Sequence, residues 1–414
     1  MQHLLSSSTD QWSDEFTLYA LTDPAVIANP YKWYECLRRF GPIYLDETVG
    51  WVCTGFPECE RILRNEKQFQ VIPPVPPRAD ADLTVHFGQQ MLFLDANGAE
   101  HRHIRYLLAQ RLLSKKSNVA SNDHWHDCLT QAAKDLLMPV KAQGRQEIDL
   151  VSEYAGLLPT LLTFELLGLS QQDRTQLMRW NDAYESLLSL PSGDVEEALL
   201  MMKQETEYFS HVITDRRHHL GDDLISDMIR GNLTDQQIIA NCIVLAAGGY
   251  ETTTHLISIA IYWLSQFPDQ LRLLRNDPAF LASALREVMR YDGSSQFLAR
   301  RTKVDVPIGG RVIPAGQTVY VLLAAANRDG RQFPDPHRFD IERPISRHLG
   351  FGAGRHACLG GPLAERLSEL AVQIFLDLFP DYHVTVRYED LPWNVMHSNV
   401  RCVKHLPVQL QASS

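Results

Sequence analysis

The longest apolar pattern in the chain starts just after Thr234. Hydrophobic residues recur at helical spacing from Ile238 to Leu264. Thr234 and Gln237 form a Thr-x-x-Gln capping box, and Pro268 predicts the end of the helix. The pattern therefore predicts a helix of about 30 residues, roughly 45 Å long. A helix that is so long and so apolar is expected to cross the core of the molecule.

The middle of this predicted helix departs from the pattern. Gly248 and Gly249 are weak helix formers, and Glu251 and Thr252 follow them. A carboxylate in a core helix must be paired or hydrogen-bonded, or its pKa shifts. Two interpretations are open: a kink with locally satisfied threonines, or a widened groove in which a carboxylate and a hydroxyl face a ligand.

The pattern changes after Arg300, where short strands are predicted. Residues 304–308 and 311–313 flank Gly309-Gly310 and predict a hairpin, and residues 319–323 predict a buried strand. The proline-rich residues 71–77 predict an irregular loop, either a plain surface loop or one that faces a substrate. The fold class is thus mainly α with small β-sheets, in a single domain over residues 1–414, with residues 1–15 as a flexible N-terminal tail.

Composition narrows the function classes. The net charge of −11 disfavours nucleic acid as a partner. The N-terminus has neither a basic region nor a long apolar core, so no signal peptide is predicted, and no membrane anchor either. The seven cysteines are scattered without a Cys-x-x-Cys pair, which fits free thiols in a cytoplasmic protein and disfavours a zinc site.

One cysteine stands in a glycine-rich loop, residues 351–360, with the sequence Phe-Gly-Ala-Gly-Arg-His-Ala-Cys-Leu-Gly. Glycines allow the backbone to turn tightly around the sulfur of Cys358. From the loop alone, this thiol could be a nucleophile, half of a disulfide or a metal ligand. A thiolate that holds heme iron increases its electron density and favours cleavage of the O–O bond.

The loop resembles the heme-binding signature of the cytochrome P450 family. The resemblance extends from about residue 30 onwards and implies the mainly α cytochrome P450 fold, a heme b cofactor and Cys358 as the iron ligand. It also implies that Phe351 and Gly360 shape the loop around the cofactor.

Further motifs of the family occur in the same order along the chain. Glu287-x-x-Arg290 and Arg338 resemble a buried structural network that fixes the cysteine loop. The resemblance implies that the heme propionates are bound by four cationic residues: His101, Arg105, Arg300 and His356.

Residues 248–252 resemble the oxygen-binding motif of the family. The resemblance implies that Gly248 leaves room beside the heme, that Glu251 relays protons and that Thr252 delivers them. The segments that line the distal pocket in the family correspond here to Gln90, Met91, Gln296, Phe297, Leu298, Val395 and Met396.

The implied reaction is monooxygenation of a medium-sized, largely apolar organic substrate, by hydroxylation or epoxidation. Electrons from NAD(P)H are expected to arrive through a separate ferredoxin and ferredoxin reductase, and the chain is expected to be a monomer. A cationic surface for the ferredoxin is predicted at Arg102, Arg111, Lys115, Lys116 and Arg355. Three departures from the family pattern are Gly248 for alanine, Ser294 for proline and Glu365 for arginine.

Two alternatives remain open at this point. One is a peroxide-using or non-oxygenating rearrangement or coupling enzyme on the same fold, and the other is a heme-binding sensor without turnover. The intact Glu251-Thr252 pair argues against both, because such proteins have less need for controlled proton delivery.

Overall fold

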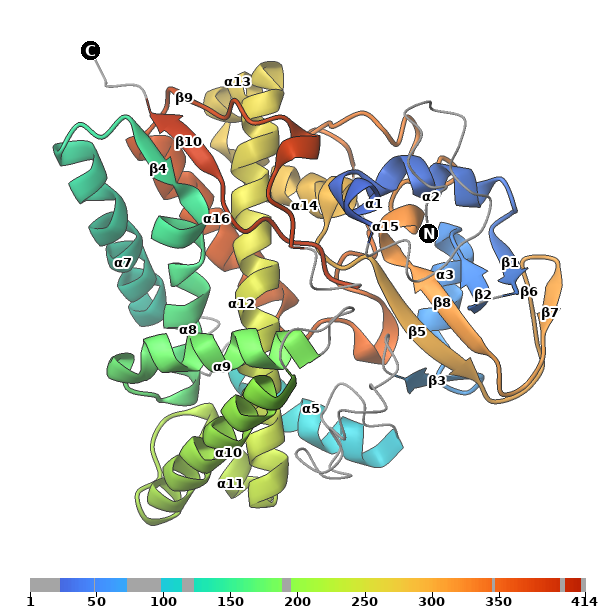
Figure 1. The fold of residues 1–414 in the computed structure, drawn as a ribbon, viewed down its shortest axis with the longest axis horizontal. Helices are drawn as coiled ribbons and strands as arrows, with labels where there is room; N and C mark the ends of the chain where they lie inside the picture. The colour runs from blue at the N-terminus through green and yellow to red at the C-terminus, as the bar shows by residue number, and fades with distance from the viewer. Residues whose placement is uncertain are drawn as a thin grey trace.

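The computed structural model describes residues 23–47, 49–72, 98–113, 123–187, 195–344, 347–394 and 399–410. Helices fill one side of the molecule and the larger sheet lies on the other (Figure 1). The helices in the described ranges are α1 Pro24–Ala28, α2 Pro30–Arg38, α3 Phe56–Arg64, α5 Gly98–Leu112, α7 Asp123–Ala142, α8 Leu157–Leu167, α9 Arg174–Leu187, α10 Val195–His218, α11 Leu224–Arg230, α12 Asp235–Gln266, α13 Pro268–Asn276, α14 Leu281–Asp292, α15 Leu323–Ala326 and α16 Gly361–Leu378. Short turns of 3₁₀ or π-helix are η2 Val151–Ala155, η3 Gln171–Asp173, η4 Pro278–Phe280, η5 Gly354–His356 and η6 Tyr388–Asp390.

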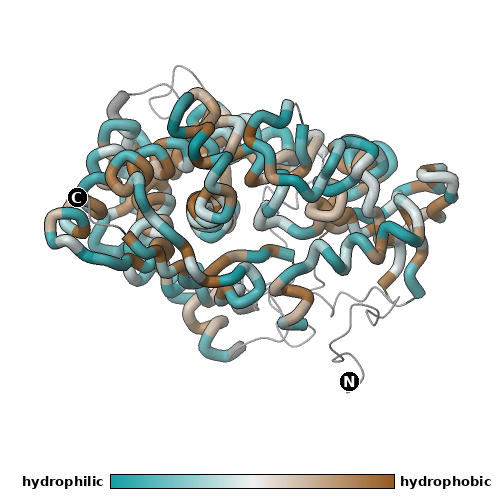
Figure 2. The backbone as a smooth tube through the Cα atoms, turned by 90° about the horizontal axis from the view of Figure 1, so that it is seen from above, coloured by the Kyte–Doolittle hydropathy of each residue, from teal (hydrophilic) through white to brown (hydrophobic). Residues whose placement is uncertain are grey.

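Helix α12 is the long helix that the sequence predicts. It spans 32 residues and starts with the predicted capping box, in which Thr234 and Gln237 bond each other's backbone N–H groups. It runs through the centre of the molecule, where α8, α14 and α16 pack against it (Figure 1). Along the helices, apolar segments alternate with polar ones, as expected for helices buried on one side (Figure 2). Helix α12 is thus the axis around which the other helices are arranged.

The larger sheet has five strands in the order β1-β2-β8-β5-β3. The strands are β1 Ile43–Asp46, β2 Gly50–Cys53, β3 Phe69–Ile72, β5 Phe297–Thr302 and β8 Thr318–Leu322. Strand β2 pairs in parallel with β8, and the other neighbours are antiparallel. The buried strand predicted over residues 319–323 is therefore confirmed, displaced by one residue.

The predicted hairpin is also present. Strands β6 Val306–Ile308 and β7 Arg311–Ile313 pair antiparallel, with Val306 opposite Ile313. Gly309 and Gly310 form the turn with φ of +57° and +76°, values that favour glycine. Most of the predicted proline-rich loop, residues 73–77, lies outside the described residues, as does the proposed tail of residues 1–15.

A small sheet and one buried arginine connect distant parts of the chain. Strand β10 Pro407–Leu410 pairs with β4 Glu147–Asp149 and with β9 Tyr382–His383. The buried Arg401 donates hydrogen bonds to the carbonyl oxygens of Ile27 and Ala28, at 2.5 and 2.9 Å, and to the carboxylate of Asp292, at 2.9 Å. Residues near position 27, 292 and 401 therefore meet at one buried point.

Candidate functional site

The cysteine loop contains η5 and ends at the start of α16. Gly352 and Gly354 have φ of +67° and +76°, and a Cβ on Gly354 would come within 2.6 Å of the carbonyl oxygen of Leu63 in α3. The N–H of Cys358 donates to the carbonyl oxygen of Phe351 at 2.8 Å and closes the loop. The glycines therefore allow both the tight turn and its close contact with α3.

The sulfur of Cys358 is surrounded by donors. The backbone N–H groups of Gly360 and Gly361 bond to it. Burial raises the pKa of the thiol, while these two N–H groups and the charge of Arg105 lower it. The side chain is nevertheless exposed. Since burial still acts on its pKa, we interpret the exposure as access to an internal space rather than to the outer surface.

Four basic residues, two histidines and two arginines, converge beside this loop, and the arginines give this cluster its positive charge. The rings of His101 in α5 and His356 in η5 stack with their centroids 4.0 Å apart. Burial, then the charges of His101, Arg300 and Arg105, lower the pKa of His356 to about 3. Burial lowers the pKa of Arg300 to about 10, and lowers the pKa of Arg105 and His101 as well. The neighbouring Arg301 is exposed, whereas Arg300 points inward.

This cationic cluster fits a ligand with carboxylates. The Nε2 atom of His101 is buried and has no hydrogen-bond partner among the described residues. Within the described ranges, Arg105 and Arg300 form no ion pair with a carboxylate, and Arg300 donates to the carbonyl oxygen of Ala299. Buried cations normally require anionic partners. The two propionates of a heme would supply them next to the sulfur that would hold its iron.

The centre of α12 offers the space that such a cofactor needs. Gly248 is exposed although it lies in the middle of a buried helix, and a Cβ there would meet no other described element within 4 Å. A Cβ on Gly360 of the cysteine loop would also meet none of the described residues within this distance. The helix continues through Gly248 and Gly249, and the space at Gly248 favours the interpretation of a groove. The hydroxyls of Thr252 and Thr254 bond to carbonyl oxygens one turn earlier, as the kink interpretation also expects.

Glu251 and Thr252 follow these glycines in α12. Burial, then the charge of Asp182, raise the pKa of Glu251 to about 7, and the charge of Lys404 opposes them. The hydroxyl of Thr252 donates to the carbonyl oxygen of Gly248 at 2.9 Å. A carboxyl group that titrates near neutrality can both accept and release a proton, next to a hydroxyl that can pass one on.

The predicted network behind the loop is correct in two residues and wrong in the third. Glu287 and Arg290 are buried and form two hydrogen bonds of 2.7 Å. The predicted third member, Arg338, is 62% exposed, and its guanidinium lies 3.8 Å from Asp340. Arg343 takes its place: its Nε lies 3.3 Å from Glu287.

The reason for this difference is visible in the backbone. The carbonyl oxygen of Arg338 accepts bonds from Arg290 at 3.2 Å and from Arg343 at 3.0 Å, so its backbone joins the network while its side chain points outward. Arg338 and Arg343 lie in one irregular segment, where sequence spacing does not indicate which side chain points inward.

The predicted ferredoxin surface needs a correction too. Arg102 and Arg355 are exposed, and Arg355 pairs with Glu66 at 3.2 Å. The prediction for Arg111 is wrong, because this side chain is buried and paired with Asp222 and Asp227. Lys115 and Lys116 lie outside the described residues.

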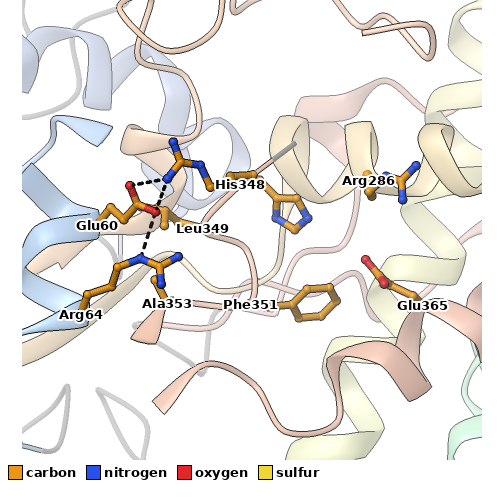
Figure 3. Close-up of a pocket in the computed structure, with 10 residues that line it drawn as sticks. Glu60, Arg64, Arg286, His348, Leu349, Phe351, Ala353 and Glu365 are labelled. Carbon is orange, nitrogen blue, oxygen red and sulfur yellow. Dashed lines mark hydrogen bonds and ion pairs between the residues drawn. The ribbon is translucent and has the colours of Figure 1, made fainter. Parts of the chain in front are cut away.

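A pocket of about 260 Å³ opens beside the cysteine loop (Figure 3). Phe351 of the loop lies in it, with Arg286 and Glu365 on one side. On the other side Glu60 pairs with Arg64 and with Arg347, each at 3.1 Å. Acidic and basic side chains thus both line this pocket, which lies beside the loop that carries Cys358.

The predicted substrate contacts are only partly retained. Gln296 is buried, donates to the carbonyl oxygen of Gly293 at 2.9 Å and accepts from the hydroxyl of Tyr34 at 3.0 Å. Phe297 is fully buried in an apolar cluster. Both residues belong to the core, so their assignment to the pocket is wrong. Leu298 is partly exposed and remains a candidate. The other four candidates lie outside the described residues: Gln90, Met91, Val395 and Met396.

Together, the loop, the cationic cluster and the open helix centre fit the site of a heme protein. Comparison with known proteins agrees with this class. The cytochrome P450 family model matches residues 39–278 and 275–380. The chain belongs to the cytochrome P450 family.

Its relatives include bacterial enzymes of similar length. The biotin biosynthesis cytochrome P450 of Bacillus subtilis (strain 168) is 31% identical over 395 residues, which cover 93% of this chain and 97% of the relative. The cytochrome P450 monooxygenase PikC of Streptomyces venezuelae is 31% identical over 396 residues, 92% of this chain and 91% of PikC.

Solved structures of relatives have the same fold. The structure of P450BioI in complex with an acyl carrier protein ligated to hexadec-9Z-enoic acid superposes with a TM-score of 0.85 at 31% identity, covering 93% of this chain and 100% of that chain. CalO2 superposes with a TM-score of 0.85 at 27% identity, covering 97% of this chain and all of CalO2.

Several expectations from the sequence are thereby confirmed. The fold is the mainly α cytochrome P450 fold, the cofactor is heme b, and the protein is an oxidoreductase of a family that uses O₂ and separate electron donors. Within the part of the chain that the structure describes, no helix is long and apolar enough to span a membrane.

Proposed function

We propose that this protein inserts one atom of O₂ into a medium-sized, largely apolar organic substrate by hydroxylation or epoxidation. The proposal depends above all on the environment of Glu251, a largely buried carboxyl whose pKa lies at about 7 beside the hydroxyl of Thr252. Monooxygenation consumes protons in a site that must otherwise stay dry. A group that is half protonated at neutral pH can supply them.

Each residue of the site has a proposed role. Cys358 would hold the iron, with its charge stabilised by the N–H groups of Gly360 and Gly361. The four residues of the cationic cluster would bind the propionates. When bound, the heme supplies the chemistry that activates O₂. Glu251 would take a proton from the side of Asp182 and Lys404, and Thr252 would pass it towards the open space at Gly248.

Relatives support the proposed substrate class. One is the 6-deoxyerythronolide B hydroxylase of Saccharopolyspora erythraea, 30% identical over 392 residues. The P450BioI structure contains hexadec-9Z-enoic acid. Leu298, the candidate contact that remains among the described residues, is apolar.

We therefore expect a fatty acyl chain or a similar apolar compound to change the heme absorption spectrum on binding, as measured by titration against a compound library. If only small polar compounds changed the spectrum, the substrate class would be wrong.

The proposed electron donors are a ferredoxin and its reductase, acting on a monomer in the cytoplasm. The seven cysteines all lie in the described residues and no disulfide joins them, which fits a reducing compartment. The exposed Arg102 and Arg355, together with the pocket beside the cysteine loop, provide a surface for an acidic partner. Reversal of Arg355 to Glu should slow electron transfer from ferredoxin at low salt, while reversal of the exposed Arg387 should not.

The decisive test is Thr252→Ala. The variant should still bind heme and substrate. It should divert a large share of the electrons to the reduction of O₂ to hydrogen peroxide, so that less product forms per NAD(P)H consumed. Thr254→Ala is the matched control, because Thr254 makes the same type of bond to the carbonyl oxygen of Tyr250 on a buried face of α12. An unchanged product yield in Thr252→Ala would contradict the role of Thr252.

Two further measurements test the proposal, one against a peroxygenase and one against another iron ligand. Full turnover with hydrogen peroxide alone, without an electron donor, would favour a peroxygenase. Cys358→His should abolish the thiolate band of the reduced carbon monoxide complex. Retention of this band would mean that another cysteine holds the iron.

A further inference from the structure

We propose that Arg111 is a positioning residue for the heme: through Asp222 and Asp227 it fixes the helix that presents His101 and Arg105 to the propionates. This inference depends on the proposed role of these two residues. It replaces the prediction that Arg111 binds a redox partner, since its side chain is 8% exposed and fully engaged.

The contacts of Arg111 are unusually complete for an arginine near the surface. Its Nε lies 2.5 Å from a carboxylate oxygen of Asp227 in α11. Its two terminal nitrogens donate to the carbonyl oxygen of Asp222 at 3.1 Å and to the carboxylate of Asp222 at 2.6 Å. Three of its donors are therefore used on one short segment, and such charge-assisted bonds fix direction as well as distance.

Other contacts join α5 to Gly231, which follows α11, and to the first turn of α12. The side-chain nitrogen of Gln237 donates to Glu100 at 2.9 Å, while the oxygen of the same amide serves the capping box of α12. His103 lies 3.2 Å from the carbonyl oxygen of Gly231. A Cβ on Gly231 would lie 2.4 Å from Leu107, so the helix is in close contact there.

Helical geometry shows what these contacts accomplish. At about 100° per residue, His101 and Arg105 lie within about 40° of each other on α5. The angle from His101 is about 100° for Glu100, about 160° for His103 and about 80° for Arg111, and all three lie at least about 120° from Arg105. One side of α5 thus presents the two propionate residues, and other sides of the helix are bound to α11, to Gly231 after it and to the first turn of α12. Rotation or sliding of α5 would move both propionate residues at once.

Of these residues, Arg111 makes the most hydrogen bonds, and it lies near the C-terminal end of α5. Glu100 lies near the N-terminal end, so the two contacts secure the helix at both ends. Because Arg111 does not contact His101 or Arg105 directly, its effect on heme must pass through the position of the helix. This makes Arg111→Gln a specific perturbation of helix placement rather than of the heme contacts themselves.

The test compares Arg111→Gln and Asp227→Asn with two control variants of the full-length holoprotein. Arg102→Gln removes an exposed arginine from the same helix. Arg230→Gln removes the other partner of Asp227, at 2.9 Å, without touching α5. We measure the rate of heme transfer to excess apomyoglobin and the resonance Raman band of the propionate bending motion. A role confined to the stability of α11 would leave this band unchanged.

We expect Arg111→Gln to lose heme on the order of tenfold faster and to shift the Raman band. Asp227→Asn should lie between Arg111→Gln and the wild type, and both control variants should match the wild type. Heme loss at the wild-type rate with an unchanged band, in either Arg111→Gln or Asp227→Asn, would overturn the inference. Failure of the wild-type protein to bind heme through a thiolate would instead contradict the proposed function.

Discussion

Replacement of Glu205 by Gln should stabilise the protein at alkaline pH and not at acidic pH. Glu205 lies in α10 with no exposed surface, and neither of its carboxyl oxygens has a hydrogen-bond partner among the described residues. Burial raises its pKa to about 8 from an ordinary value of 4.5. The carboxyl is therefore protonated in the folded protein at neutral pH, while the unfolded chain has already released this proton.

The sign and the size of the effect follow from this difference. Between pH 4.5 and 8 the folded state holds one more proton than the unfolded state, so the free energy of unfolding falls as pH rises. The fall is about 1.4 kcal/mol per pH unit, which amounts to roughly 3 kcal/mol by pH 7. Below pH 4.5 both states are protonated and this loss is absent. Gln is neutral at every pH and has a similar volume, so it removes the pH dependence of this one group.

Urea unfolding of the holoprotein, followed at pH 5, 6.5 and 8, measures the effect. Glu205→Gln should have about the wild-type midpoint at pH 5 and a clearly higher one at pH 8. The control is Glu207→Gln, an exposed position two residues further along α10, where the difference from wild type should stay small at each pH. A stability difference for Glu205→Gln that does not grow with pH would refute the reasoning.

Three other predictions concern the site. Because the charge of Lys404 lowers the pKa of Glu251, Lys404→Met should move the corresponding midpoint in the pH profile of product formation to higher pH, and an unchanged midpoint would contradict this coupling. Arg343→Gln should destabilise the holoprotein in urea by about 2–3 kcal/mol, because it leaves a buried carboxylate short of a donor, whereas the exposed Arg338→Gln should change stability by less than about 0.5 kcal/mol. Gly354→Ala should sharply reduce the heme bound per protein, since its Cβ would collide with a backbone oxygen at φ of +76°; normal heme content would show that the loop can move aside.

The sequence predicted those features whose cause is local. The capping box at Thr234, the hairpin around Gly309 and the glycine turn at Cys358 each depend on a few adjacent residues. The pairing of β2 with β8 joins segments more than 260 residues apart, and no local pattern indicates it. Local rules therefore explain the elements but not the sheet that they form.

In the candidate site too, the residues of a local motif were predicted, and those whose direction depends on the fold were not. Motif spacing led to Glu287 and Arg290, which are one helical turn apart, but it could not choose between Arg338 and Arg343 in an irregular segment. Glu205 was missed although a signal existed. It occupies an apolar position of α10, three residues after the buried Met202 and four before the buried Phe209. A charged residue on the apolar face of a helix is a sequence feature that can be searched for.

The contacts of Arg401 have a consequence for biosynthesis. Its guanidinium joins the backbone at Ile27 and Ala28 to Asp292, and the aromatic ring of Trp393 lies 3.2 Å from its central carbon. During translation, residues 27 and 292 leave the ribosome long before residue 401. Until residue 401 has been made, the carboxylate of Asp292 lacks this arginine as its partner. The carbonyl oxygens of Ile27 and Ala28 likewise lack the donor that joins α1 to the core. Folding around this point must therefore wait until residue 401 has been made, and the segments near residues 27 and 292 must be kept from aggregating until then.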